Sequence, residues 1–218
     1  MKDGNIRLQP ASEHMSSSDT LAGSDGRPRC RWCAAAPEFE PYHDREWGFP
    51  VADDTRLFEK LCLEGFQSGL SWRTILSKRE NFRRAFEGFD IPRVACFGDK
   101  QVTRLLQDEG IVRHRGKIEA VINNAQCALR LQAEMGSLAA HFWRFEVDPS
   151  TAARPQTASV APQSVALSKD LKKRGWKFVG PTTVYAFMQA MGLVNDHVAG
   201  CVVAAQVAQA RKAFRVPA

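Results

Sequence analysis

Two distant stretches of the sequence carry side chains of the types that bind metal ions. His197 and Cys201 lie four residues apart in VNDHVAGC, so on a helix they would share one face. Near the other end, Cys30 and Cys33 form a C-x-x-C pair, and His43 follows the second cysteine. One of these cysteines together with the other three donors makes a two-cysteine, two-histidine set, which is the composition of a closed structural zinc site.

Such a zinc site would join the two ends of the chain and stabilise a helical domain whose termini otherwise fray. The spacing does not choose between Cys30 and Cys33. Each half of the set is also common by chance, so the alternative is that these are ordinary buried cysteines and hydrogen-bonded histidines.

The segments that must position these donors have the periodicity of helices. Residues 53–66 begin with aspartate caps and continue with an apolar stripe, and residues 71–89 begin with a Ser71 cap. Further helices are expected over 99–108, 115–132, 137–145, 164–176 and 181–193, with Leu129 on the buried stripe of the second of these. No alternating strand pattern competes. The predicted class is all-α, a compact bundle of about eight short helices.

Composition bounds the environment of the protein. Its 218 residues are 44% hydrophobic and 25% charged, as in soluble globular proteins. No apolar run approaches the ~18 residues of a membrane span, and the N-terminus lacks the apolar centre of a signal peptide. We therefore expect a cytoplasmic protein without membrane contact, with six reduced cysteines. The net charge of +6 favours a polyanionic partner.

The chain divides into one folded unit and two ends. Residues 1–28 are rich in Ser, Asp, Gly and Pro, which predicts a disordered tail. Residues 29–201 form the predicted domain, with a flexible loop near 149–164. Residues 202–218 are a C-terminal extension that either prolongs the last helix or trails off.

Six blocks of the sequence resemble the DNA-3-methyladenine glycosylase I family of helix-hairpin-helix repair enzymes. They run in order from Cys30 to Cys201 as RCRW, YHDREWG, LFEKLCLEGFQSGLSW, GIVRHRGKI, ALSKDLKKRGWKFVG and YAFMQAMGLVNDHVAGC. The resemblance implies a monofunctional enzyme that flips out and hydrolytically excises 3-methyladenine from alkylated double-stranded DNA, releasing the free base. It also implies a structural zinc ion held by Cys30, His43, His197 and Cys201.

The resemblance assigns base recognition to Glu64. A carboxylate there can accept hydrogen bonds from the adenine amino edge and oppose the positive charge of the methylated base. Trp72 offers a flat face on which a cationic ring can stack, and Tyr42, Trp47 and Trp32 are candidate walls. Without the resemblance, a solvated glutamate and core aromatic side chains would be the plainer interpretation.

The segment GFQSGLS between the glutamate and the tryptophan suits contact with DNA. Gly69 lets the backbone come close to the duplex. Leu70 is an apolar wedge of the kind that unstacks bases, although it could instead open the core stripe of the next helix.

Residues 167–188 are predicted to form helix, turn and helix, the best helix-hairpin-helix candidate in the chain. The turn places Gly180 where a positive φ is expected and Pro181 at the first position of the second helix. Free N–H groups at such a turn bind phosphate oxygens, and Lys173 and Lys177 add positive charge.

A second basic turn, GIVRHRGK, carries Arg113 and Arg115. It is either another DNA contact or a solvated loop between two helices.

Three functions compete for these features. The first is the glycosylase, acting as a monomer and by simple hydrolysis, because no lysine is an obvious Schiff-base nucleophile. The second is a zinc-stapled DNA-binding module without catalytic activity. The third, a hydrolase with catalytic zinc, is disfavoured because four protein ligands leave no open position on the metal.

Asp196 is expected to neighbour the zinc site and orient its ligands.

Overall fold

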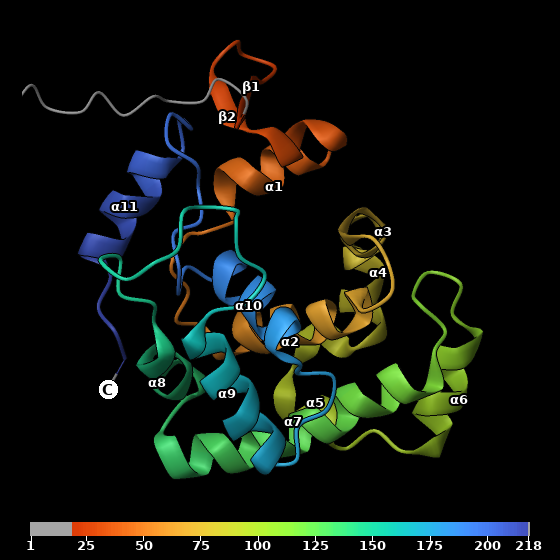
Figure 1. Cartoon of the computed structure of the whole chain (residues 1–218). Coiled ribbons are helices and arrows are strands. Elements are labelled where there is room, and N and C mark those ends of the chain that lie inside the picture. The colour runs from red at the N-terminus through yellow and green to blue at the C-terminus, as the bar shows by residue number, and fades with distance from the viewer. Residues whose placement is uncertain (1–18, 218) are drawn as a thin grey trace, which may run out of the picture.

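The computed structural model describes residues 19–217, and helices dominate this part of the chain (Figure 1). The α-helices are α1 (Phe39–Arg45), α2 (Asp54–Gln67), α3 (Trp72–Ser77), α4 (Arg79–Ala85), α5 (Ile91–Ala95), α6 (Asp99–Gln107), α7 (Arg115–Met135), α8 (Leu138–Phe142), α9 (Pro162–Lys173), α10 (Pro181–Ala190) and α11 (Ala204–Ala213). Short 3-10 helices are η1 (Arg31–Ala35), η2 (Glu87–Phe89) and η3 (Trp143–Phe145). The predicted all-α class is confirmed.

Helix α2 lies at the centre of the bundle and contacts α3, α7, α8 and α10 (Figure 1). Its first turn is capped by Asp53, whose side chain accepts a hydrogen bond of 2.8 Å from the backbone N–H of Arg56. Ten successive residues of α2, from 57 to 66, are buried. This burial on all sides fixes the helix that carries Glu64.

The segment 71–89, expected as one helix, divides into α3, α4 and η2. Ser71 is the cap of α3, as predicted, and accepts a hydrogen bond from Thr74. The chain bends at Lys78, and Gly88 adopts a φ of +69° inside η2. The prediction that Leu129 lies on the buried stripe of α7 is wrong, because its side chain is exposed.

A small antiparallel ladder, β1 (Thr20–Ala22) with β2 (Pro28–Cys30), precedes η1. The prediction of a tail over residues 1–28 therefore differs from the structure after residue 18, and the earlier residues lie outside the described part. Arg29 anchors the ladder, because its buried guanidinium pairs with Asp25 and Asp44. The sequence does not predict this ladder, because each strand has only three residues and is held by ion pairs instead of an alternating apolar pattern.

The predicted loop near 149–164 is irregular up to residue 161, where α9 is about to begin. Its middle is fastened to the domain, since the backbone N–H of Gln156 donates to Asp196 over 3.0 Å. The C-terminal extension contains α11, followed by Phe214, whose ring packs on Trp143 at 4.4 Å. Among residues 19–217, no helix has both the length and the apolar character needed to cross a bilayer.

Candidate active site and metal centre

The four donors proposed for zinc meet in one buried cluster. Cys30, His43, His197 and Cys201 place their ligand atoms within 4.8 Å of one another, and all four residues are buried. Cys33 is not one of these four, although it is buried too. The structure therefore favours Cys30 over Cys33, as the resemblance did.

The spacing of the donors fits a tetrahedral zinc site. With Zn–S of about 2.3 Å and Zn–N of about 2.0–2.1 Å, tetrahedral angles put sulfur and nitrogen about 3.6 Å apart. The Sγ of Cys201 lies 3.5 Å from Nε2 of His43 and 3.6 Å from Nδ1 of His197. The Sγ of Cys30 lies 3.6 Å from the same Nδ1.

The second nitrogen of each histidine ring has its own acceptor. Nδ1 of His43 lies 2.7 Å from a carboxylate oxygen of Asp44, and Nε2 of His197 lies 3.0 Å from the carbonyl oxygen of Trp47. These bonds place the protons on the outer nitrogens and turn the inner lone pairs toward the sulfurs. Both the donor set and its outer partners therefore suit a closed metal site.

The thiols of Cys30 and Cys201 shift each other's pKa values in opposite directions. The pKa of Cys201 lies well below its usual value, mainly because the S–H of Cys30 donates a hydrogen bond to its thiolate. The pKa of Cys30 is raised, because its neighbour already carries the charge and because it is buried. A divalent metal would replace the proton of Cys30 and stabilise both thiolates.

The stretch VNDHVAGC is not helical, so the helix on which His197 and Cys201 would share one face is not present. The stretch lies in the irregular loop between α10 and α11, and Gly192 and Gly200 of this loop adopt φ values of +83° and +85°. A β-carbon on Gly192 would meet the backbone of Pro50 at 2.6 Å, so only glycine fits this turn. The two donors meet through the loop instead.

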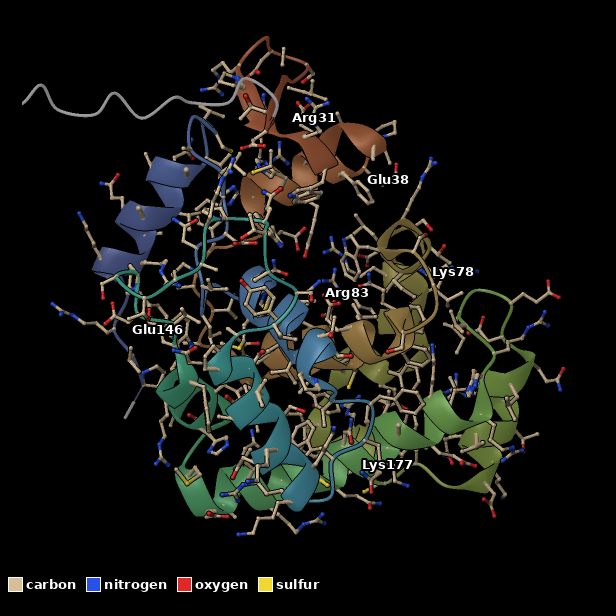
Figure 2. The ribbon with its side chains drawn as sticks, in the orientation of Figure 1. Arg31, Glu38, Lys78, Arg83, Glu146 and Lys177 are labelled. Atoms are coloured by element: carbon tan, nitrogen blue, oxygen red, sulfur yellow. The ribbon has the colours of Figure 1, made fainter. Side chains whose placement is uncertain are left out.

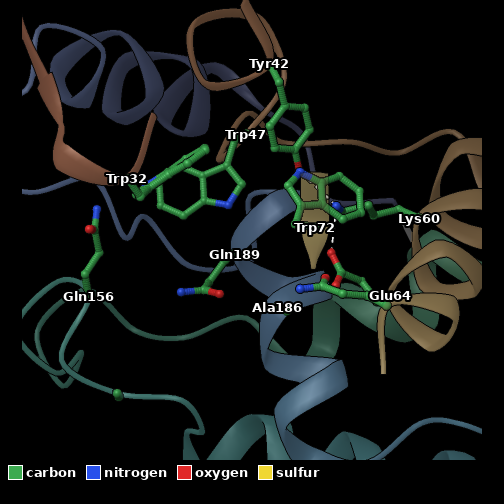
Figure 3. A pocket seen from close by; sticks show the side chains of 11 residues that line it. Trp32, Tyr42, Trp47, Lys60, Glu64, Trp72, Gln156, Ala186 and Gln189 are labelled. Carbon is green, nitrogen blue, oxygen red and sulfur yellow. Dashed lines mark hydrogen bonds and ion pairs between the residues drawn. The ribbon is translucent and has the colours of Figure 1, made fainter. Parts of the chain in front are cut away.

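A cavity of about 290 Å³ opens beside the metal cluster. All five side chains predicted to recognise the base line it, and they come from η1, α1 and the turn after it, α2 and α3 (Figure 3). These five are Trp32, Tyr42, Trp47, Glu64 and Trp72. The structure thus brings together residues that the sequence separates by up to 40 positions.

The metal cluster supports one wall of this cavity. The ring of Trp47 contacts His197 edge-on at a centroid distance of 4.7 Å, and Trp32 contacts Trp47 at 5.1 Å. Tyr42 precedes His43 on α1, and its ring lies 5.4 Å from that of Trp72. The aromatic walls therefore depend on the position of the two histidines.

Sequence reasoning missed Lys60, which also lines the cavity. Its Nζ lies 2.6 Å from Oε1 of Glu64, 2.9 Å from the hydroxyl of Tyr42 and 3.4 Å from the ring centre of Trp72. The side chain is 6% exposed. Its i, i+4 spacing from Glu64 could have suggested the ion pair, but not its burial.

Asp196 does not orient a metal ligand, contrary to the prediction. Its carboxylate accepts hydrogen bonds from the backbone N–H of Gln156 and from Nε2 of Gln189, at 3.0 and 2.6 Å. Both glutamines line the cavity. The carboxylate beside a ligand belongs instead to Asp44, the residue that follows His43.

The predicted wedge lies in an exposed turn after α2. Leu70 is 43% exposed and α3 begins only at Trp72, so Leu70 does not open a core stripe. Gly69 has a φ of +80° with open space around it. Lys117 fixes the turn, because its Nζ donates to the carbonyl oxygens of Phe66 and Ser68.

The predicted turn between α9 and α10 is present, but the residue predicted to have a positive φ, Gly180, does not have one. Gly180 has a φ of −63° and caps α10, because the following Pro181 favours an extended conformation at the residue before it. The positive φ values fall on Gly175 and Phe178. Pro181 is the first residue of α10, as predicted.

Helix α7 holds this turn beside α2. Lys177 lies in this turn (Figure 2). Asn124 of α7 donates to the carbonyl oxygen of Lys177 and accepts from its N–H, at 2.9 and 2.8 Å. Across the turn, a β-carbon on Gly65 would lie 3.3 Å from Phe178, so α2 and the turn are in close contact. The α9–α10 turn therefore packs against the last turns of α2, the helix that precedes Leu70.

The basic side chains predicted for DNA contact are exposed. Lys173 and Lys177 lie at the end of α9 and in the following turn. Arg113 and Arg115 precede and begin α7, where they pair with Glu109 and Glu119 at 3.4 and 3.2 Å. Exposed ion pairs of this kind contribute little to stability, so the two arginines can exchange their carboxylate partners for DNA phosphates.

Comparisons with known proteins agree with one another. The family model described as methyladenine glycosylase matches residues 32–204. DNA-3-methyladenine glycosylase 1 of Escherichia coli K12 is 50% identical over 177 residues, which cover 79% of this chain and 95% of that protein. DNA-3-methyladenine glycosylase of Haemophilus influenzae is 44% identical and covers 79% and 96%.

Solved structures extend the similarity to the fold. A crystal structure of a 3-methyladenine DNA glycosylase I superposes with a TM-score of 0.74 at 47% identity, covering 80% of this chain and 98% of that one. A structure of the Staphylococcus aureus enzyme, which concerns 3-methyladenine recognition, gives 0.72 at 36% identity and covers 78% and 92%. This chain therefore belongs to the methyladenine glycosylase family.

Proposed function

We propose that the protein is a monofunctional DNA glycosylase that flips 3-methyladenine nucleotides out of alkylated double-stranded DNA and hydrolyses the glycosidic bond. The observation that carries the proposal is the joint placement of the Glu64 carboxylate and the Trp72 indole in one cavity of about 290 Å³. Its relatives in the family are named for this activity. The enzyme is expected to act as a monomer in the cytoplasm.

The chemistry follows from the charge of the substrate. A 3-methylated adenine is cationic in DNA and leaves as a neutral base, so the enzyme need not protonate it. Glu64 accepts hydrogen bonds from the amino edge and opposes the positive charge, and Trp72 stacks on the ring. Water then attacks the sugar carbon, and the electrons of the broken bond go to the base.

The metal is proposed to be structural zinc, held by Cys30, His43, His197 and Cys201. Four protein ligands leave no position for a reactive water, so the ion would supply rigidity rather than a nucleophile. It would fix the histidine rings on which Trp47 and Tyr42 depend.

A DNA-binding module without activity would account for the charge, the turn and the metal, but not for the cavity.

Methylated duplex DNA incubated with the protein and examined by mass spectrometry should release free 3-methyladenine and leave the strand intact. Binding of the same DNA without release of any base would contradict the proposal.

The wedge is proposed to act on the duplex alone. Unstacking a base step costs a few kcal/mol, so Leu70→Ala should lower kcat/KM on methylated duplex by about tenfold. Activity on methylated single strands should change little, because no stack is opened there. Leu129→Ala, which removes another exposed leucine from α7, is the control. Equal losses on both substrates would mean that Leu70 does not unstack the duplex.

The α9–α10 turn is proposed as a helix-hairpin-helix phosphate clamp, with Lys173, Lys177, Gly180, Arg113 and Arg115 around it. Lys177→Ala should reduce the slope of log affinity against log salt concentration by about one, because one phosphate contact releases about one counterion. Lys212→Ala, on α11, should leave the slope unchanged. A titration of binding against salt measures both, and equal slopes for the Lys177 variant and the parent would remove this lysine from the interface.

A further inference from the structure

The base cavity already contains a cation. Lys60 projects from α2 one turn before Glu64, and its ammonium touches three groups that the proposed function assigns to the base (Figure 3). Its Nζ lies 2.6 Å from the carboxylate and 3.4 Å from the centre of the indole ring. A cationic purine is expected to use the same two partners, an acid and an aromatic face.

Two further ion pairs lie beside Lys60. The guanidinium of Arg79 pairs with Glu46 through two bonds of 2.6 and 2.9 Å. Arg83 pairs with Glu59 at 2.8 Å. A smaller cavity next to Lys60 is lined by these four residues and by Arg56. Glu64 is the carboxylate that pairs with Lys60, so a cation that enters the cavity competes with the ammonium for this carboxylate.

A methylated base and a protonated Lys60 do not fit together electrostatically. Two unit cations beside one carboxylate in a site of low dielectric constant repel each other strongly. The positive charge of the base is fixed by its methyl group, whereas the ammonium can release a proton. Burial lowers the pKa of Lys60, against the opposing effect of Glu64.

We propose that the ammonium of Lys60 takes the place of the cationic base in the free enzyme, where it contacts Glu64 and Trp72. When the damaged base binds, Lys60 loses a proton, and the base takes over these two contacts. This proposal rests on the proposed function. One N–H bond of the ammonium breaks and its proton passes to solvent, so the charge of the occupied cavity equals that of the free one. After the glycosidic bond breaks, the base is neutral and the amine takes a proton back.

The hydrogen bond to Tyr42 survives this exchange. In the free enzyme the ammonium donates to the phenol oxygen over 2.9 Å. When the amine is neutral, the phenol O–H can donate to its lone pair. The exchange also gives a reason for selectivity, because neutral adenine carries no charge with which to replace the ammonium at Glu64.

Two variants and a pH profile test the exchange. For the parent, KM for methylated duplex should fall as pH rises from neutral, by up to about tenfold per unit, because binding releases one proton. Lys60→Met removes the competing cation, so KM at neutral pH should fall at least fivefold and lose this pH dependence. Lys60→Arg keeps a charge that is not released, and its KM should rise at least tenfold at every pH.

The opposite results would overturn the proposal. If Lys60 only positioned Glu64, Lys60→Met would raise KM and lower kcat at every pH, and Lys60→Arg would resemble the parent. Thermal melting checks that both variants fold. If Lys60→Met does not fold, the parent profile and the arginine variant still decide, because a flat parent profile excludes proton release. Failure of the proposed function is distinguishable, since the parent would then release no base at any pH.

Discussion

Glu64→Gln should lower kcat/KM for release of 3-methyladenine from methylated duplex DNA by about 100- to 1,000-fold, the size of effect seen when one preorganised electrostatic contact is removed. The carboxylate is 5% exposed, so its attraction for a cationic base is weakly screened by water. The amide keeps the shape and one acceptor oxygen but carries no charge. Release of base from methylated DNA under single-turnover conditions measures the effect.

The control for this variant lies on the same helix. Glu59 is 8% exposed and pairs with Arg83, as Glu64 pairs with Lys60, but it does not line the large cavity. Glu59→Gln should therefore cost similar stability and leave activity near that of the parent. If Glu64→Gln melts like this control yet remains fully active, Glu64 does not recognise the base.

The sequence predicted the donors of the metal cluster better than the backbone that presents them. Cysteine and histidine identities are visible in the sequence, and the family resemblance selected Cys30. The loop that brings His197 to Cys201 depends on left-handed glycines and on the close approach of Gly192 to Pro50, which spacing does not reveal. The i, i+4 spacing of His197 and Cys201 is compatible with a shared helix face, but the two donors meet through this loop.

The residue types of the base cavity could also be predicted from the sequence, but not their full arrangement. Aromatic and acidic side chains of the two blocks were identified, because their types suit a cationic purine. Lys60 was overlooked, because a lysine four residues before a glutamate on a helix is usually a surface pair. Its role depends on burial, and burial depends on how α1, α3 and α4 pack around α2. Likewise, nothing in the local sequence connects Asp196 to Gln156, forty residues away.

The largest effect on stability is expected from the metal cluster. Structural zinc contributes about 10–16 kcal/mol of binding free energy in zinc-finger peptides. In this domain the rest of the chain has its own core, so only part of that binding free energy should contribute to stability. A loss of about 4 kcal/mol would still lower Tm by roughly 8–16 °C for a chain of this size. Cys201→Ala should show at least this decrease, with less than one-tenth of an equivalent of bound zinc.

Cys33→Ala is the matched control, because Cys33 is also buried and lies in the same C-x-x-C pair as Cys30, but outside the four-donor cluster. It should retain one zinc per chain by elemental analysis and melt within a few degrees of the parent. A chelator should lower the Tm of the parent and of this control, and leave Cys201→Ala unaffected. If Cys33→Ala lost the metal and Cys201→Ala kept it, the ion would not join the two ends of the chain. The wall formed by Trp47 would then need another support, because the ring of His197 on which it packs would have no fixed partner at Nδ1.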